Sequence, residues 1–289
     1  MPLSTTPFAI IGSGRVASSL GRVLRERGAP VQWIAGRDPQ HTRIAADFVG
    51  GVEALPLESV PSVASRVLMA VSDTAITEVA QRLASAGLRD KDGVALHTAG
   101  SRGPEALAPL AAEGISTGVL YPLQTFPTPA QGARSLPGTY FAVTGDQRAR
   151  EWAGQIVDLI PGNFLSVAPK QWTLCHAAAV LASNYQVTLL DAALEALEQA
   201  GVTPEEGLAA LAPLVRATLE NVLRLGPRSA LTGPIARGDC ETVRRNREAL
   251  EAVSPATQEL YRAAGRRTVP IARRRGLPAS LLEELEESL

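Results

Sequence analysis

A glycine-rich turn near the start of the chain constrains the fold most strongly. The residues Gly12-Ser13-Gly14-Arg15-Val16-Ala17 follow a short apolar run, Phe8–Ile11, and precede an amphipathic pattern that predicts a helix over Val16–Arg27. The first glycine permits a tight turn, the second lets the backbone approach a diphosphate, and the small alanine lets the helix lie close to the strand. Free backbone N–H groups at the positive end of that helix would bind the anion. The segment therefore predicts the opening unit of a dinucleotide-binding domain.

The end of the next predicted strand, Val31–Ala35, indicates which dinucleotide would bind. Domains that bind NAD usually place a carboxylate about 20 residues beyond the glycines, where it accepts the ribose hydroxyls. Here Gly36 and Arg37 take that place. A guanidinium attracts the 2′-phosphate of NADP, which a carboxylate would repel. We therefore predict NADP as the cofactor, with Arg43 as a second cation within reach; the alternative is that Arg37 is only a solvated loop residue.

The composition argues against several classes of protein. The chain has 289 residues, 45% of them hydrophobic, and a net charge of −1, so it can bury a substantial core and has no general attraction for nucleic acid. The arginine clusters at 244–247 and 273–275 fit solvated helix faces or helix ends. No run reaches the roughly 18 apolar residues of a membrane span. With two cysteines lacking metal spacing and three histidines, we expect no metal site and a reduced, cytoplasmic compartment.

Through the first half of the chain, short apolar runs alternate with helical patterns. This alternation predicts a mostly parallel sheet with helices on both faces and a ligand at the carboxyl ends of the strands. Asp38 and Pro39 fit the N-cap and first turn of one helix. The further strands are expected at 67–71, 93–97, 117–120, 140–144 and 164–167, and the further helices up to about 86 and at 104–113 and 146–159.

The pattern changes near Ala168-Pro169, and no convincing strand follows. A long helix is expected over 169–199, a second over 204–225 that begins with a capping box at Thr203 and Glu206, and others after Asp239, Ser254 and Pro278. We therefore predict a dinucleotide-binding domain over 1–168 and an all-helical domain over 169–289 for substrate binding and dimerisation. Faces rich in alanine and leucine exceed what one small domain needs to bury, which predicts a homodimer; they include Leu189, Ala193, Ala196 and Leu197.

Six segments in this order resemble one known family: Gly12-x-Gly14-x-x-Ala17, His97–Ser101, Tyr121–Phe126, His176–Ala179, Ser183–Tyr185 and Leu231–Asp239. It is a bacterial family in which a Rossmann-like NADP-binding domain precedes a C-terminal helical domain of unknown function. Its broader relatives are ketopantoate reductase, pyrroline-5-carboxylate reductase, F420-dependent NADP oxidoreductase and the β-hydroxyacid dehydrogenases. The resemblance covers the chain except about the last 25 residues. It implies an α/β Rossmann-like, mostly parallel sheet followed by an all-helical C-terminal domain, but no particular reaction. Tyr121 stands where the resemblance leads us to expect histidine.

In a hydride transfer the cofactor supplies or accepts the hydride. The protein positions the substrate and donates or accepts one proton. The ends of two predicted strands supply further cofactor-binding candidates. Ser72 and Asp73 would lie near the ribose, and the alternative is that one of them only caps the next helix. The segment His97–Ser101 would approach the nicotinamide, and the alternative is an ordinary polar strand end. The candidates at these two ends are Val71, Ser72, Asp73, Thr98 and Ala99.

Two side chains of the expected helix over 169–199 are the catalytic candidates, His176 and Asn184. Eight residues at about 100° each would place them about 80° apart, so both could face one cleft. His176 suits proton transfer because its ordinary pKa of about 6.5 is near working pH, and the alternative is a hydrogen-bonded core histidine. Asn184 would orient the substrate or nicotinamide, and the alternative is a structural amide. The relatives carry a lysine on the corresponding helix, and Lys170 is out of register with it.

Three further residues are substrate-binding candidates: Gln124, Thr125 and Arg237. Arg237 could clamp a substrate carboxylate from a glycine-containing loop, whereas Asp239 fits a helix cap and Cys175 a core position. The sequence thus predicts an NADP-dependent oxidoreductase that acts on a C=O or C=N group of a small, carboxylate-bearing metabolite. The alternative is a non-catalytic NADP-binding sensor or regulatory protein.

Overall fold

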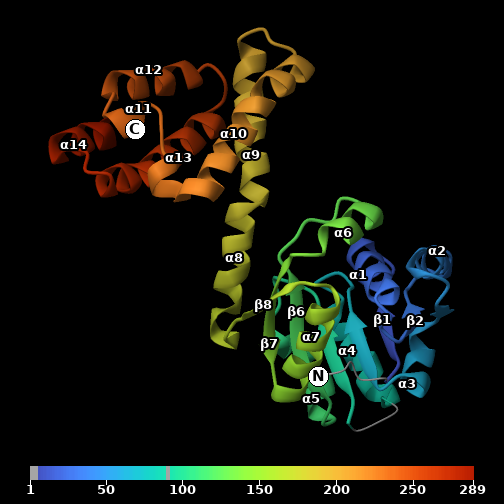
Figure 1. Cartoon of the computed structure of the whole chain (residues 1–289). Coiled ribbons are helices and arrows are strands. Elements are labelled where there is room, and N and C mark those ends of the chain that lie inside the picture. The colour runs from blue at the N-terminus through green and yellow to red at the C-terminus, as the bar shows by residue number, and fades with distance from the viewer. Residues whose placement is uncertain (1–5, 89–91) are drawn as a thin grey trace. The chain divides into compact units, whose positions relative to one another are not determined.

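The structure is a computed structural model that describes residues 6–88 and 92–289 (Figure 1). Its contacts form two compact units, Met1–Val180 and Leu181–Leu289. Residues 169–180 thus pack with the first unit, and the domain division after residue 168 stays a prediction. Each unit is described by itself.

The first unit contains one sheet. Within the described residues its strands lie in the order β3-β2-β1-β4-β5-β6-β7-β8. Strands β1 to β6 run parallel to one another, β7 is antiparallel to β6, and β8 is parallel to β7. The predicted α/β fold with a mostly parallel sheet is therefore confirmed. The strands are β1 (Phe8–Ile11), β2 (Val31–Ala35), β3 (Glu53–Leu55), β4 (Arg66–Met69), β5 (Val94–His97), β6 (Ser116–Pro122), β7 (Tyr140–Gly145) and β8 (Asn163–Ser166).

Helices pack on both faces of this sheet. They are α1 (Arg15–Glu26), α2 (Pro39–Val49), η1 (Leu57–Ser59), α3 (Val60–Val63), α4 (Ile76–Ala86), η2 (Pro104–Leu107), α5 (Ala108–Ala112), α6 (Pro129–Ser135), α7 (Gln147–Leu159), η3 (Pro169–Gln171) and α8 (Trp172–Ala182). Side chains alternate along a strand, so Phe8 and Ile10 of β1 enter one hydrophobic core while Ala9 and Ile11 enter another. The first core includes α1, α2 and α7, and the second includes α3, α4 and α5 (Figure 1).

Helix ends follow the sequence signals where a side chain can cap them. The carboxylate of Asp38 accepts hydrogen bonds from the backbone N–H groups of Gln40 and His41, as expected for the N-cap of α2. In the second unit, Thr203 and Glu206 form the predicted capping box. These local signals fix where a helix begins because they satisfy N–H groups that lack a partner within the helix.

The prediction of one continuous helix over 169–199 is wrong. A short 3-10 segment, η3, precedes α8, and α9 (Asn184–Gln199) begins only after Ser183, whose φ of −125° and ψ of −67° are not helical. Serine and asparagine side chains compete for backbone hydrogen bonds inside a helix, and here the two are adjacent. The angle of about 80° between His176 and Asn184 assumed an uninterrupted helix and does not apply.

The second unit is helical throughout. Besides α9 it contains α10 (Pro204–Ala230), α11 (Pro234–Arg237), α12 (Cys240–Leu250), α13 (Pro255–Arg274) and α14 (Ala279–Ser288), and no strand follows β8 among residues 167–289. Helix α10 is kinked at Gly226, where φ is +76°, near the end predicted for this helix. Buried residues of α12, α13 and α14 make its core, including Val243, Val269 and Leu285.

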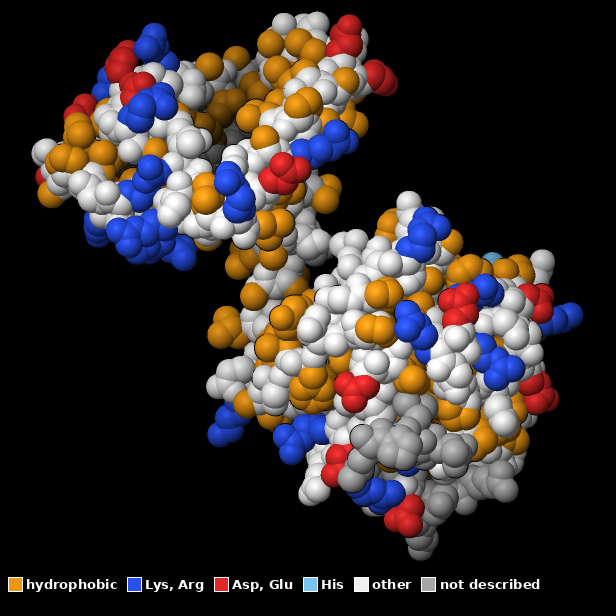
Figure 2. Space-filling view, viewed as in Figure 1, with side chains coloured by type: hydrophobic (Ala, Val, Ile, Leu, Met, Phe, Trp, Pro, Cys, Tyr) orange, Lys and Arg blue, Asp and Glu red, His pale blue; other side chains and the backbone are white. Residues whose placement is uncertain are grey.

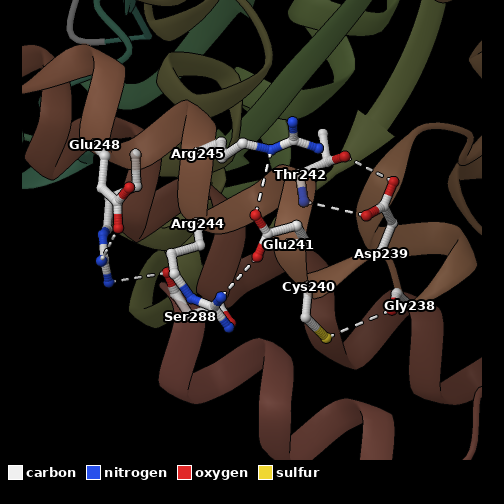
Figure 3. A network of polar contacts seen from close by, with 10 residues as sticks. Gly238, Asp239, Cys240, Glu241, Thr242, Arg244, Arg245, Glu248 and Ser288 are labelled. Atoms are coloured by element: carbon white, nitrogen blue, oxygen red, sulfur yellow. Dashed lines mark hydrogen bonds and ion pairs between the residues drawn. The ribbon is translucent and has the colours of Figure 1, made fainter.

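Polar contacts hold the start of α12 (Figure 3). The Asp239 carboxylate accepts hydrogen bonds from the Thr242 N–H at 3.1 Å and hydroxyl at 2.8 Å, so Asp239 is the predicted cap. Glu241 pairs with Arg244 at 2.7 Å and with Arg245 at 3.5 Å. These two arginines therefore lie on an exposed, charge-paired helix face rather than in an unpaired basic patch. Of the helices described, none combines the length and hydropathy that a membrane span requires.

Candidate functional site

The glycine turn between β1 and α1 requires glycine at its first position. Gly12 has a φ of +124°, and a Cβ there would lie 2.3 Å from the carbonyl oxygen of Ala70. The Gly12 N–H donates to the Ala35 carbonyl at 2.7 Å. Gly12 is thus enclosed by the ends of β2 and β4, and no larger residue fits this turn.

Gly14 has the opposite environment. A Cβ built on Gly14 would meet no atom within 4 Å, so the space beside it is open. Gly14 is the N-cap of α1, no side chain caps this helix end, and its first turn holds no acidic residue. The first N–H groups of α1 are therefore free for an anion, which the helix dipole also favours. Ala17 is fully buried in the core below the turn, as its small size predicted.

The end of β2 lies beside this turn. A Cβ on Gly36 would lie 2.5 Å from Thr42 Oγ1 and 2.9 Å from Ser13 Oγ, so Gly36 packs directly against the glycine turn. Arg37 follows and is exposed. The pKa of the Asp38 carboxyl is lowered mainly by its hydrogen bond from the His41 backbone, and the nearby Arg37 guanidinium lowers it further. A cation thus stands beside the turn at the position where an NAD-binding domain has a carboxylate.

Two more arginines are exposed on α1 and α2, the helices that follow β1 and β2. Arg15, in the first turn of α1, is exposed and donates to the Pro127 carbonyl at 3.4 Å. Arg43 is exposed on α2. Val16 packs half-buried against the core of the first unit. The structure therefore brings together Gly12, Ser13, Gly14, Arg15, Val16 and Gly36 at one edge of the sheet.

The segment after β4 does not cap the following helix. Helix α4 begins at Ile76 after Ala75, with no side-chain cap, so neither Ser72 nor Asp73 is the cap that we considered as the alternative. The Asp73 carboxylate instead accepts a hydrogen bond from the Ser101 hydroxyl. Val71 is half-buried at this end of the strand, and Ser72 is exposed. Asp73 therefore ties the segment after β4 to the segment after β5.

The buried side chain of His97 holds the segment after β5 through hydrogen bonds to its backbone. Its ring is fully buried, Nε2 lies 3.0 Å from the Gly103 carbonyl, and Nδ1 accepts a hydrogen bond from the Ala99 N–H at 3.2 Å. A ring that accepts at Nδ1 and donates from Nε2 is neutral. Burial lowers the pKa of His97, against smaller opposing effects of the bond to Gly103 and of the Glu105 and Asp73 carboxylates. Thr98 and Ala99 are nearly buried, so the segment that we predicted to border the cofactor is packed against the core.

We expect His97 to make the protein less stable in acid. Because its folded-state pKa is lowered, the neutral ring contributes stability that is complete above about pH 6.5 and is lost as the pH falls through the folded-state pKa. A single group of this kind changes the free energy of unfolding by at most about 1.4 kcal/mol per pH unit. Urea denaturation between pH 5 and pH 8 measures this slope.

The matched controls for this expectation are His97→Gln and His41→Gln. The first should flatten the slope, whereas the second should leave it unchanged because the His41 side chain is exposed. Equal slopes in the parent and in His97→Gln would contradict the assignment.

His176 lies against Gly100 and Tyr121. A Cβ on Gly100 would lie 2.5 Å from His176 Nδ1 and 2.5 Å from Tyr121 Cζ, and the two rings meet edge to face with centroids 5.7 Å apart. Nδ1 of His176 is buried and has no hydrogen-bond partner. His176 is thus half-buried with Nδ1 unpaired, and its role in proton transfer stays a prediction. Sequence reasoning missed Gly100 as its neighbour, although Gly100 lies within a motif of the resemblance.

Tyr121 and Cys175 complete the surroundings of this imidazole. Burial raises the pKa of the Tyr121 hydroxyl, and the Cys175 thiol and the Asp73 carboxylate raise it further. Burial also raises the pKa of the Cys175 thiol, so Cys175 stays protonated and fits its predicted core position. The phenol is thus neutral at physiological pH.

The predicted substrate-binding residues are dispersed. The Gln124 amide nitrogen donates to the Ser135 carbonyl and the Thr139 hydroxyl, and its oxygen accepts from the Thr125 N–H, so its polar atoms serve the local loop. Asn184 and Arg237 are exposed residues of the second unit. The roles of these residues and of Thr125 in substrate binding stay predictions, and Lys170 is an exposed residue of η3.

Comparison with protein families divides the chain in two. One family model, a Rossmann-like domain, matches residues 4–122, and another, the domain of unknown function DUF2520, matches residues 139–268. The N-terminal part of the chain is thus similar to a Rossmann-like domain, and the C-terminal part is similar to a DUF2520 domain. The resemblance inferred from the motifs is thereby confirmed. No curated protein matches the chain in sequence.

Solved structures match the chain over nearly all its length. A candidate NADP oxidoreductase from Bacteroides fragilis is 25% identical, with a TM-score of 0.74 over 93% of this chain and 98% of that one. A protein from Thermotoga maritima is 24% identical, with a TM-score of 0.71 over 97% and 98%. A pyrroline carboxylate reductase from Plasmodium falciparum, solved with NADP bound, is 11% identical, with a TM-score of 0.59 over 90% and 98%. The last two likenesses establish the shared fold.

Proposed function

We propose that this protein is an NADP-dependent oxidoreductase. It would reduce a C=O or C=N group of a small, carboxylate-bearing metabolite, or catalyse the reverse reaction. The observation that carries the proposal is the contrast within the glycine turn, where Gly12 is enclosed and Gly14 is open beside the uncapped end of α1. The Bacteroides fragilis protein, a candidate NADP oxidoreductase of the same fold, supports the same reading.

The residues at the carboxyl edge of the sheet fit such a cofactor. The N–H groups that follow Gly14 would bind the diphosphate, and Arg37 would bind the 2′-phosphate beside Gly36. The segments at Ser72–Asp73 and Thr98–Ala99 would border the ribose and nicotinamide. When bound, the nicotinamide supplies the hydride. His176, half-buried beside this edge of the sheet, would give or take the proton.

We expect Arg37→Ala to remove the preference for NADPH. A charge-assisted, bidentate contact to a phosphate contributes about 1.5–3 kcal/mol, so NADPH should bind about 10- to 100-fold more weakly to the variant. Affinity for NADH should stay the same, because NADH has no 2′-phosphate. Fluorescence titration of each nucleotide measures the two dissociation constants.

Arg216→Ala is the matched control, since it removes an arginine of the second unit that is remote in sequence from the glycine turn. It should leave both affinities at the parent values. Equal affinity of the parent protein for NADPH and NADH would overturn the assignment of NADP.

A second candidate function is a non-catalytic NADP-binding sensor or regulatory protein. The observation that favours it is the position of Lys170, which lies in η3 before α8 and does not reproduce the lysine of the reductases that the chain resembles. The two functions share the cofactor site and differ in whether His176 transfers a proton.

We also propose a homodimer through the helical unit. Large apolar side chains are exposed along α9 and α10, and Val187 and Leu223 are 72% and 86% exposed. Figure 2 shows such side chains gathered along these two helices. A contiguous apolar surface of this kind is typical of a protein interface. Sedimentation equilibrium would give twice the chain mass of 30.4 kDa, and the mass of a single chain would contradict the proposal.

The cysteines support a reducing, cytoplasmic compartment as part of this proposal. Cys175 and Cys240 are both free, and each thiol has a raised pKa because of burial. The protein folds with both thiols protonated and without a disulfide between them. This fits a compartment in which disulfides are rare.

A further inference from the structure

Two nitrogen atoms of α8 are buried without a hydrogen-bond partner, Nδ1 of His176 and Nε1 of Trp172. The residues are one helical turn apart, so their side chains lie on the same face of the helix. An indole N–H can only donate, and an imidazole Nδ1 donates in one tautomer and accepts in the other. Buried polar atoms without a partner are costly and rare in folded proteins. The Trp172 nitrogen therefore lacks an acceptor, and the His176 nitrogen lacks a partner.

Tyr121 is the residue that lies against both rings. Its ring centroid is 5.7 Å from that of His176 and 6.3 Å from that of Trp172, with edge-to-face angles of 66° and 65°. Tyr121 Cζ and His176 Nδ1 both lie 2.5 Å from the point above Gly100 where a Cβ would stand. A phenol oxygen carries two lone pairs, so it can accept two hydrogen bonds at once. Only glycine at position 100 leaves room for this approach.

We propose that Tyr121 is the positioning residue for His176. Its hydroxyl oxygen accepts one hydrogen bond from the Trp172 indole N–H and one from His176 Nδ1–H, after a small rotation of the packed rings. This holds the neutral imidazole in the tautomer that carries its proton on Nδ1. The lone pair of Nε2 is then free to take a proton, and the imidazolium gives it back from the same nitrogen. The inference rests on the proposed function only in assigning proton transfer to His176.

The surroundings of the phenol agree with this role. Burial raises the pKa of the Tyr121 hydroxyl most, and the Cys175 thiol and the Asp73 carboxylate raise it further. The hydroxyl therefore stays neutral, and to accept both hydrogen bonds it must direct its own proton away from the two donors. Tyr121 transfers no proton in this arrangement, and it acts only through the orientation of His176, in the way that the third member of a catalytic triad orients the base.

Nitrogen-15 NMR of the histidine-labelled full chain at pH 8 tests the proposal without a substrate. The chain has three histidines, which His41→Gln and His176→Gln assign. His97 is an internal reference, because its contacts require the opposite tautomer, with the proton on Nε2. In the parent, His176 should be protonated at Nδ1.

Tyr121→Phe keeps the ring and removes the acceptor, so the ratio of the Nδ1–H to the Nε2–H tautomer of His176 should fall about fivefold, the factor for one ordinary hydrogen bond. The indole proton signal of Trp172 should also move. Tyr121→His offers an imidazole lone pair in place of the phenol oxygen and should keep most of the parent ratio. The tautomer of His97 should be the same in all three proteins.

Protonation of His176 on Nε2 in the parent would overturn the proposal, and so would an unchanged ratio in Tyr121→Phe. NADPH titration of the same samples distinguishes a failure of the tautomer proposal from a failure of the proposed function. Tyr121→Phe should bind NADPH with the parent dissociation constant. A chain that binds no NADPH refutes the cofactor assignment and leaves the tautomer result standing.

Discussion

Gly12→Ala should destabilise the protein by more than about 3 kcal/mol. The backbone of Gly12 has a φ of +124° and its missing Cβ would lie 2.3 Å from a carbonyl oxygen, so alanine adds backbone strain of about 1–3 kcal/mol and a steric overlap that β4 must move to relieve. For a unit of this size the midpoint of thermal unfolding should fall by about 10 °C. Differential scanning calorimetry of the full chain measures that midpoint.

Gly14→Ala is the matched control for this prediction. Nothing lies within 4 Å of its missing Cβ, so the midpoint should stay at the parent value. NADPH affinity should nevertheless fall at least about tenfold, because the methyl group occupies the space from which the diphosphate reaches the N–H groups of α1. One lost charge-assisted hydrogen bond corresponds to about that factor. A Gly14→Ala protein with parent affinity would show that the diphosphate does not bind at this turn.

The fold of the first unit could be predicted because its signals are local. The strand before Gly12, the Asp38 cap and the alternation of apolar runs each depend on neighbours in sequence, and the sheet follows from them. The elements that the sequence did not reveal are short. Strand β3 (Glu53–Leu55), α3 (Val60–Val63) and α11 (Pro234–Arg237) have too few residues for a hydrophobic period, and α6 (Pro129–Ser135) depends on packing against α1.

The candidate site was less predictable, because contacts between distant segments define it. The turn at Gly12–Ala17 has a motif, whereas the partners of His176 come from the segment after β5 and from β6. Gly100 and Tyr121 both lie in motifs of the resemblance, but no periodic pattern in the sequence predicts that they contact α8. The break at Ser183 also separated His176 from Asn184. Ser183 forms no side-chain cap there, so no capping pattern in the sequence indicated where the helix would break.

His176→Ala should lower turnover by a factor of about 100 to 10,000, the usual contribution of a general acid or base, with NADPH affinity unchanged. His176 contacts Gly100 and Tyr121 rather than the glycine turn, so its loss should remove a proton donor and leave the diphosphate site intact. NADPH oxidation by the parent and the variant, with a panel of small 2-oxo acids and cyclic imines, measures turnover. Calorimetric titration measures the affinity in parallel.

Asn184→Ala separates orientation of the substrate from proton transfer. If Asn184 orients the substrate, its loss should raise KM. It should lower kcat less than the loss of His176 does, because a binding contact stabilises both the bound substrate and the transition state. A parent protein that binds NADPH tightly but oxidises it with none of these compounds favours the sensor. In that case His176→Ala should leave NADPH affinity unchanged, and the contacts of His176 with Tyr121 and Gly100 would serve packing rather than catalysis.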